Sequence, residues 1–163
     1  MSDPIRSISQ NNFLLADQKE VSHDNTLRGN GTEESPLGLN ETVLWSGTET
    51  VAAVTLSESA DNFEYVEIFY RINDGIYNSV KVKPIGAAQR IAFSAGGYYG
   101  TGNGLIIKFG TYTLNGSSLG PSQSKIAYIY GGNGSGTASA TIGFENNSFY
   151  LIRIVGINRI ANN

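Results

Sequence analysis

Cysteine is absent from this 163-residue chain and histidine occurs once, and these two shortages exclude several kinds of site. Without cysteine there is no disulfide framework, no thiolate metal site and no cysteine nucleophile. The single histidine, His23, stands beside Asp24 in a polar stretch, far from any recognisable serine nucleophile, whereas a catalytic triad needs all three groups. Acidic loops with calcium-binding spacing are missing too. The sequence therefore predicts no metal and no cofactor.

Long hydrophobic runs are also missing. No segment approaches the roughly 18 consecutive apolar residues of a membrane-spanning helix. The first residues, MSDPIRSISQNNFLLADQ, lack the basic and then apolar pattern of a secretory signal. We therefore expect neither insertion into a membrane nor a secretory leader.

Charge is scarce and unevenly placed. Charged residues make up 15% of the chain, against about 25% in ordinary domains. Residues 1–74 hold thirteen of the fourteen acids, while residues 75–163 hold seven of the eleven bases and a single acid, Glu145. Two interpretations stay open: acidic early strands pair with basic late strands in one sheet system, or the second half offers a basic surface to an anionic partner.

What the chain does have is strand periodicity. From Thr42 onward apolar residues recur every two positions rather than every 3.6. In EYVEIFYRI, residues 64–72, one face is apolar, and the following NDG, residues 73–75, is a strong hairpin signal. Helix is credible only before Ser22. The sequence predicts an all-β domain, an antiparallel β-sandwich or jelly roll, with further strands in residues 77–85, 103–114, 125–132, 137–144 and 149–160.

Glycoside hydrolysis is the enzymatic alternative that a sheet-rich chain raises. It usually requires two carboxylates that face each other across the substrate. Glu145 is the only acid after Asp74, and nothing in the sequence links it to an acid of the first half. We therefore expect a binding protein rather than an enzyme.

Two glycine-rich runs, GGYYGTGNG (residues 96–104) and GGNGSG (residues 131–136), resemble phosphate loops only superficially, because neither has the Gly-Lys-Ser/Thr ending. We interpret them as hairpin tips. Tyr98 and Tyr99 in the first tip either lie over their own sheet or contact a ligand such as a sugar ring. In the second case Arg90 and Lys108 could hold an anionic substituent, and Asn133 in the second tip is the next candidate.

The stretch VSHDNTLRGNGTEESPLGLN, residues 21–40, resembles a segment that recurs in bacteriophage virion appendages. There, Asp-x-Thr-Leu-x-Gly-x-Gly-Thr, a spacer and Ser-Pro-Leu-x-Leu precede a β-rich distal domain. VLWSGTETVAAVTLSES and FYLIRIVGINRI are similar, more loosely, to the sandwich domains at the ends of tail, baseplate or head-fibre proteins. The matching residues of the first segment are Asp24, Thr26, Leu27, Gly29, Gly31, Thr32, Ser35, Pro36, Leu37 and Leu39.

The chemistry of this stretch suits a trimeric neck, the assembly that the resemblance implies. Leu27, Leu37 and Leu39 are too few to form a core in one chain, but three copies could stack them around a threefold axis. Gly29 and Gly31 permit close backbone approach, and Pro36 favours extended backbone. The predicted organisation is then a virion-docking segment (residues 1–21), a short extended trimerisation neck (residues 22–41) and a distal β-sandwich (residues 42–163).

The resemblance implies a homotrimeric protein of the virion, on the head or on the tail, that contacts other virion proteins through its N-terminal segment. Its distal domain is expected to bind a host-surface glycan, and no nucleic-acid partner is expected. Two alternatives remain: a purely structural collar, adaptor or head-decoration protein without a receptor role, and a polysaccharide-degrading tail enzyme, which the missing carboxylate pair disfavours.

Overall fold

The computed structural model describes residues 27–29, 38–72, 75–99, 104–131 and 140–160. The chain divides into two compact units, residues 1–40 and residues 41–163. In the first unit, strands β1 (Leu27–Arg28) and β2 (Gly38–Leu39) pair antiparallel, with Leu27 opposite Leu39. Two of the predicted neck leucines are therefore neighbours within one chain. Gly31, Pro36 and Leu37 lie outside the described residues.

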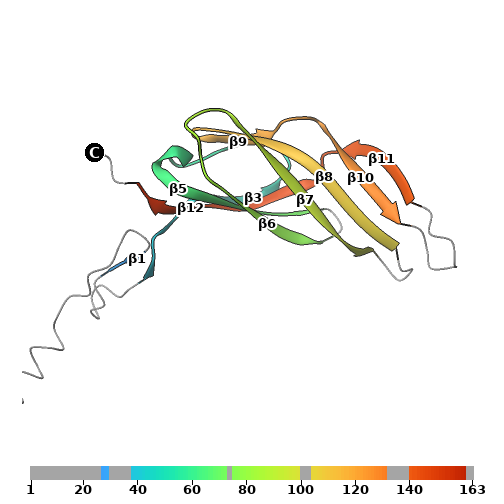
Figure 1. The fold of residues 1–163 in the computed structure, drawn as a ribbon, viewed down its shortest axis with the longest axis horizontal. Helices are drawn as coiled ribbons and strands as arrows, with labels where there is room; N and C mark the ends of the chain where they lie inside the picture. Colours follow the sequence, from blue (N-terminus) through green and yellow to red (C-terminus); the bar gives the residue numbers. More distant parts are fainter. Residues whose placement is uncertain (1–26, 30–37, 73–74, 100–103, 132–139, 161–163) are drawn as a thin grey trace, which may run out of the picture. The chain divides into compact units, whose positions relative to one another are not determined.

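The second unit consists of two antiparallel sheets, which confirms the predicted all-β, sandwich-like fold (Figure 1). One sheet has the order β3-β12-β5-β6. The other has the order β11-β10-β8-β9-β4, in which β10 and β9 pair with different halves of β8, and β7 pairs with β8 along its length. No helix among the described residues is long and apolar enough to cross a bilayer. The elements are β3 (Glu41–Thr50), β4 (Val54–Thr55), the 3-10 turn η1 (Ala60–Asn62), β5 (Phe63–Ile72), β6 (Tyr77–Val82), β7 (Gln89–Tyr99), β8 (Gly104–Asn115), β9 (Ser118–Pro121), β10 (Lys125–Gly131), β11 (Ala140–Asn146) and β12 (Phe149–Arg159).

Strand β5 shows how the sequence pattern becomes structure. Its alternate residues Val66, Ile68, Tyr70 and Ile72 are buried against the other sheet, as the period of two predicts. The residues between them form the outer face of the sheet. Asn73 and Asp74 of the predicted hairpin lie outside the described residues, but β6 returns antiparallel beside β5, as expected.

The core centres on a stack of three aromatic rings. Phe93 of β7 lies between Tyr70 of β5 and Tyr112 of β8, with both centroid distances 4.3 Å, and Phe149 of β12 packs edge-on against Tyr70 and Phe93. The Tyr70 hydroxyl donates to the Ser94 carbonyl and the Tyr112 hydroxyl donates to the Phe149 carbonyl, both at 2.9 Å. Because the rings come from both sheets, and both tyrosine hydroxyls are hydrogen-bonded, the stack fixes how the sheets pack.

The charge asymmetry is used in part within the sandwich. Arg159 binds Glu58, and the hydrogen bond from Arg159 holds the pKa of the Glu58 carboxyl below its ordinary value. Lys81 lies opposite Glu67 across the β5–β6 ladder. At these two places an early acid meets a late base, but the ion pairs Arg71–Glu49 and Lys108–Glu145 each lie within one half of the chain, so neither charge interpretation is decided.

Candidate ligand-binding site

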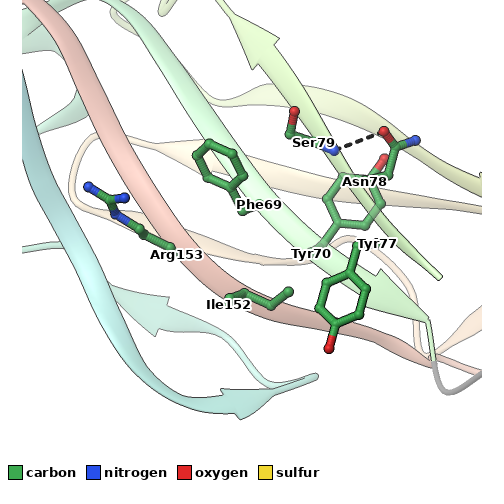
Figure 2. Close-up of a pocket in the computed structure, with 7 residues that line it drawn as sticks. All are labelled: Phe69, Tyr70, Tyr77, Asn78, Ser79, Ile152 and Arg153. Atoms are coloured by element: carbon green, nitrogen blue, oxygen red, sulfur yellow. Dashed lines mark hydrogen bonds between the residues drawn. The ribbon is translucent and has the colours of Figure 1, made fainter. Parts of the chain in front are cut away.

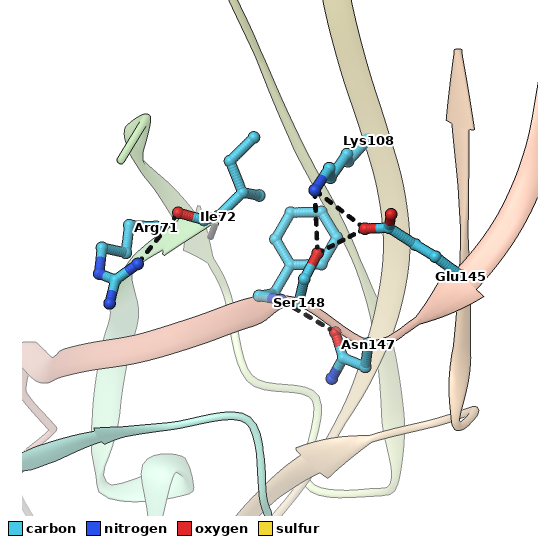
Figure 3. A network of polar contacts seen from close by, with 7 residues as sticks. Arg71, Ile72, Lys108, Glu145, Asn147 and Ser148 are labelled. Atoms are coloured by element: carbon cyan, nitrogen blue, oxygen red, sulfur yellow. Dashed lines mark hydrogen bonds and ion pairs between the residues drawn. The ribbon is translucent and has the colours of Figure 1, made fainter. Parts of the chain in front are cut away.

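Lys108, predicted to hold an anionic substituent, is instead part of the interior. It is 1% exposed, and its Nζ lies 2.9 Å from Glu145 Oε1 and 3.3 Å from Ser148 Oγ (Figure 3). The Ser148 hydroxyl donates in turn to Glu145 Oε1 at 2.8 Å. The prediction is corrected by burial: this ammonium serves an internal ion pair and does not face a ligand.

The predicted partners of Lys108 are also separated from one another. Arg90 lies near the start of β7, opposite Thr113, and is exposed. Tyr98 lies eight residues further along the same strand, opposite Leu105. At about 3.4 Å per residue the two backbones are roughly 27 Å apart, too far for one small ligand to span. Arg90 and Tyr98 therefore do not form one site.

Tyr98 and Tyr99 continue strand β7 rather than forming a loop tip, with Tyr99 opposite Gly104. Their side chains, like Asn133, lie outside the described residues, so their ligand contact stays a prediction. The signal for β7 was present in the alternation of Ile91, Phe93 and Ala95, all buried. The two glycines that follow favoured a loop, yet Gly96 belongs to the strand: a Cβ there would lie 2.9 Å from the Ile106 carbonyl oxygen.

The structure instead reveals a pocket on the outer face of the four-stranded sheet, with a volume of about 460 Å³. It extends over β5, β6 and β12 (Figure 2). The outward positions of the β5–β6 ladder supply Phe69 opposite Ser79, and Tyr77 opposite Arg71. Sequence analysis missed the pocket because its residues come from strands up to 84 positions apart in the chain. The lining residues are Phe69, Tyr70, Tyr77, Asn78, Ser79, Ile152 and Arg153.

A β-bulge shapes this pocket. Leu151 pairs with Tyr70 and Arg153 with Phe69, so β12 has one residue more than β5 between these pairs, and that residue is Ile152. The ladder with β3 is shifted at the same place. A bulge breaks the strict alternation and redirects side chains locally. As a result Ile152 is half-buried in the lining and Arg153 extends outward beside Phe69.

The pocket combines aromatic faces with fixed polar groups. Tyr77 is 67% exposed, and its ring faces the pocket (Figure 2). The Ser79 hydroxyl donates to Glu67 Oε1 at 2.8 Å, the Ser79 N–H donates to Asn78 Oδ1 at 2.9 Å, and the Asn78 amide donates to the Ser94 carbonyl at 2.8 Å. These bonds hold the polar side chains in place before any ligand arrives, which lowers the entropic cost of binding.

The arginines around the pocket differ in how they are partnered. Arg71 pairs with Glu49 at 2.5 Å and lies over the Tyr150 ring, and its hydrogen bond to Glu49 raises the pKa of this guanidinium. Arg153 is exposed, and within the part of the chain that the structure describes no acidic side chain forms an ion pair with it. Arg153 is thus available to an anionic group.

The two core tyrosines are harder to ionise than exposed tyrosines. Burial raises the pKa of the Tyr112 hydroxyl to about 12 and also raises that of Tyr70. Among the residues described, no group of three acidic or histidine side chains is placed to hold a metal ion.

No protein-family model, curated protein or solved structure matches the chain.

Proposed function

We propose that this chain is a noncatalytic glycan-binding protein of the bacteriophage-appendage type, and that its β-sandwich binds a host-surface saccharide in the pocket over β5, β6 and β12. The observation that carries the proposal is the grouping of Phe69, Tyr77 and the unpaired Arg153 around that pocket. The virion setting, the homotrimer and the docking role of residues 1–21 rest on the resemblance of residues 21–40.

A saccharide suits this pocket better than a purely apolar ligand. Sugar rings present C–H faces that pack on the exposed ring of Tyr77 and on Phe69, while their hydroxyls need hydrogen-bonding partners. Ser79 and Asn78 offer polar atoms at the rim. A volume of about 460 Å³ falls in the range of small-ligand sites.

Arg153 favours saccharides with an acidic substituent. A guanidinium donates two parallel hydrogen bonds to a carboxylate or phosphate. A neutral sugar has no anionic group to accept them in this way. This proposal retains the anionic partner suggested by the basic second half of the sequence, but assigns it to Arg153 in place of Lys108 and Arg90.

The second candidate is a structural collar or adaptor. Exposed apolar side chains on the opposite sheet favour it, because such surfaces mark contacts with protein. The two roles use different faces and are compatible.

Saccharide binding tests the proposed function. Tyr77→Ala should weaken binding of an acidic oligosaccharide by roughly 5- to 150-fold, the loss of about 1–3 kcal/mol typical of an interface anchor. Arg153→Gln should weaken binding of acidic saccharides but leave that of neutral ones unchanged. Titration calorimetry measures the affinity of both variants. The matched control is Tyr65→Ala, because Tyr65 lies on the same face of β5 as Phe69 but outside the pocket.

Unchanged affinity in both variants would remove this pocket from consideration. If affinity were lost instead in the double variant Tyr98→Ala with Tyr99→Ala, the ligand would bind at the end of β7. Release of reducing ends from the saccharide would contradict the noncatalytic role.

A further inference from the structure

Arg153, Phe69 and Ser79 lie side by side across the pocket. In the sheet register, Phe69 of β5 pairs with Arg153 of β12 on one side and with Ser79 of β6 on the other. Neighbouring strands are about 4.8 Å apart, so the backbones of Arg153 and Ser79 are separated by roughly 10 Å, with the Phe69 ring between them (Figure 2). Polar groups at this spacing flank a single sugar ring that lies on Phe69.

The hydrogen bond between Ser79 and Glu67 determines what the serine can offer to a ligand. A carboxylate accepts hydrogen bonds but cannot donate them, so the hydroxyl proton of Ser79 points to Glu67 Oε1, 2.8 Å away. Ser79 Oγ then retains lone pairs but has no further proton. Toward the pocket this atom can therefore only accept, and its partner must be a donor such as a free sugar hydroxyl.

Arg153, on the other side of Phe69, offers the opposite kind of group. A guanidinium has donors and no acceptor. Arg153 is also the one charged residue among the described residues that line the pocket, and no acid of the described residues forms an ion pair with it. One side of the pocket thus requires an acceptor on the ligand, and the other side requires a donor.

The Glu67 carboxylate limits the charge that the ligand can carry. Lys81 lies opposite Glu67 in the ladder, but its ammonium is placed over the Tyr65 ring, 4.7 Å from the ring centroid. A second negative charge on the ligand would not be matched by Arg153 and would be repelled by Glu67. A carboxylate attached to a sugar ring is a monoanion that keeps the ring itself within the pocket, whereas a phosphodiester lies between two units of a polymer.

We propose that the pocket recognises a carboxylated sugar ring, a hexuronate, in one orientation. The carboxylate lies at Arg153, one face of the ring lies on Phe69, and a ring hydroxyl donates to Ser79 Oγ. Glu67 is a positioning residue, because it does not touch the saccharide but keeps Ser79 an acceptor. This inference rests on the proposed function and adds to it the class of sugar and the group that selects it.

Titration calorimetry on the full-length chain tests the class of sugar. The probes are trimers of galacturonate and of glucuronate, each compared with its methyl ester, which keeps the ring and its hydroxyls but loses the charge. At least one trimer should bind roughly 10- to 100-fold more tightly than its ester, because hydrogen bonds between charged groups are strong. Arg153→Gln should abolish this difference. A glycerol phosphate trimer, the phosphodiester alternative, should bind no better than the esters.

Fluorinated sugars test the role of Glu67. In methyl glycosides of the preferred hexuronate, each ring hydroxyl is replaced in turn by fluorine, which is similar in size but cannot donate a hydrogen bond. One replacement should weaken binding to the wild type by about fivefold, the loss of one neutral hydrogen bond, and should have no effect in Ser79→Ala. In Glu67→Ala the Ser79 proton is free to turn to the fluorine, so the loss should shrink. The matched control, Glu64→Ala, removes another hydrogen-bonded carboxylate of β5 outside the pocket and should keep the full loss.

The outcomes separate this inference from the proposed function. If neither uronate trimer binds better than its ester, while maltotriose or the glycerol phosphate trimer binds and loses affinity in Tyr77→Ala, the inference is overturned and the proposed function stands. If Tyr77→Ala weakens the binding of none of these probes, both are overturned. A loss on fluorination that is as large in Glu67→Ala as in the wild type would refute the positioning role, because a merely structural residue would weaken all the sugars equally.

Discussion

Lys108 shows how one residue can change meaning between sequence and structure. In the sequence it is a base among strand residues; in the fold its ammonium is enclosed between the sheets beside Glu145 and Ser148. Removing a charge from water is costly, so a buried ammonium requires both a counterion and hydrogen-bonding groups. Lys108 comes from β8 and Glu145 from β11. Glu145 is also the only acid after Asp74. The carboxylate that seemed the sole late catalytic candidate therefore has a structural role.

Glu145→Gln should destabilise the fold by about 3–5 kcal/mol, because it leaves the enclosed ammonium without this carboxylate. Lys108→Met should cost less, since Glu145 is partly exposed and its charge can be hydrated. The double variant should regain stability relative to Glu145→Gln alone. Urea unfolding of the four proteins gives this cycle. If Glu145→Gln proved as stable as the wild type, the ion pair would not support the fold.

Strand β12 is the element on which both sheet packing and the pocket depend. It lies between β3 and β5, and its bulge at Ile152 shapes the pocket lining. Four residues later, Gly156 lies under the buried ring of Phe63, where a Cβ would approach the ring carbons to 2.5 Å. The same strand thus contains a bulge that shapes a pocket and a position where only glycine fits.

Gly156→Ala should therefore destabilise the sandwich by about 1–3 kcal/mol, the usual cost of overpacking a core. Gly47→Ala in the neighbouring strand β3 is the control, because a Cβ there lies 3.3 Å from an outer atom of the Trp45 ring at an exposed position. We expect that variant to melt close to the wild type. Comparable melting of the two alanine variants would show that Phe63 moves aside without cost.

At the scale of the whole molecule, the sandwich has two different outer faces. The face of β5, β6 and β12 combines aromatic rings with charged and polar groups, and the face of β8, β10 and β11 is apolar. The proposed homotrimer would carry three copies of the pocket at once. Such repetition raises the overall avidity for a surface-bound glycan without any new contact.

The purified chain is predicted to be a trimer, about three times 17.4 kDa, held by the neck leucines. Leu27→Ser with Leu39→Ser should shift the trimer toward monomers. Leu39 is exposed in the single chain, so its replacement should leave the fold of the β-sandwich intact. Multi-angle light scattering measures the masses. A wild-type monomer at micromolar concentration would refute the assembly.

Sequence alone determined the fold class. The alternation in EYVEIFYRI buries Val66, Ile68 and Tyr70 and leaves Glu67 and Phe69 outside, because the period of two is a local property of extended backbone. The same reasoning placed the hairpin after Ile72. It failed at β7, because Gly96 and Gly97 led to the prediction of a loop although Ile91 and Phe93 alternate as buried residues.

Tertiary structure alone decided which side chains share a surface. Arg153 meets Phe69 only because β12 pairs with β5 through a bulge, and Ile142 joins Ile107 only because β10 lies between their strands. Likewise, nothing local predicts that Lys108 is enclosed while Arg153 stays exposed. Strand order and register depend on the packing of the complete sandwich, so they are encoded in contacts between distant residues rather than in any short stretch of sequence.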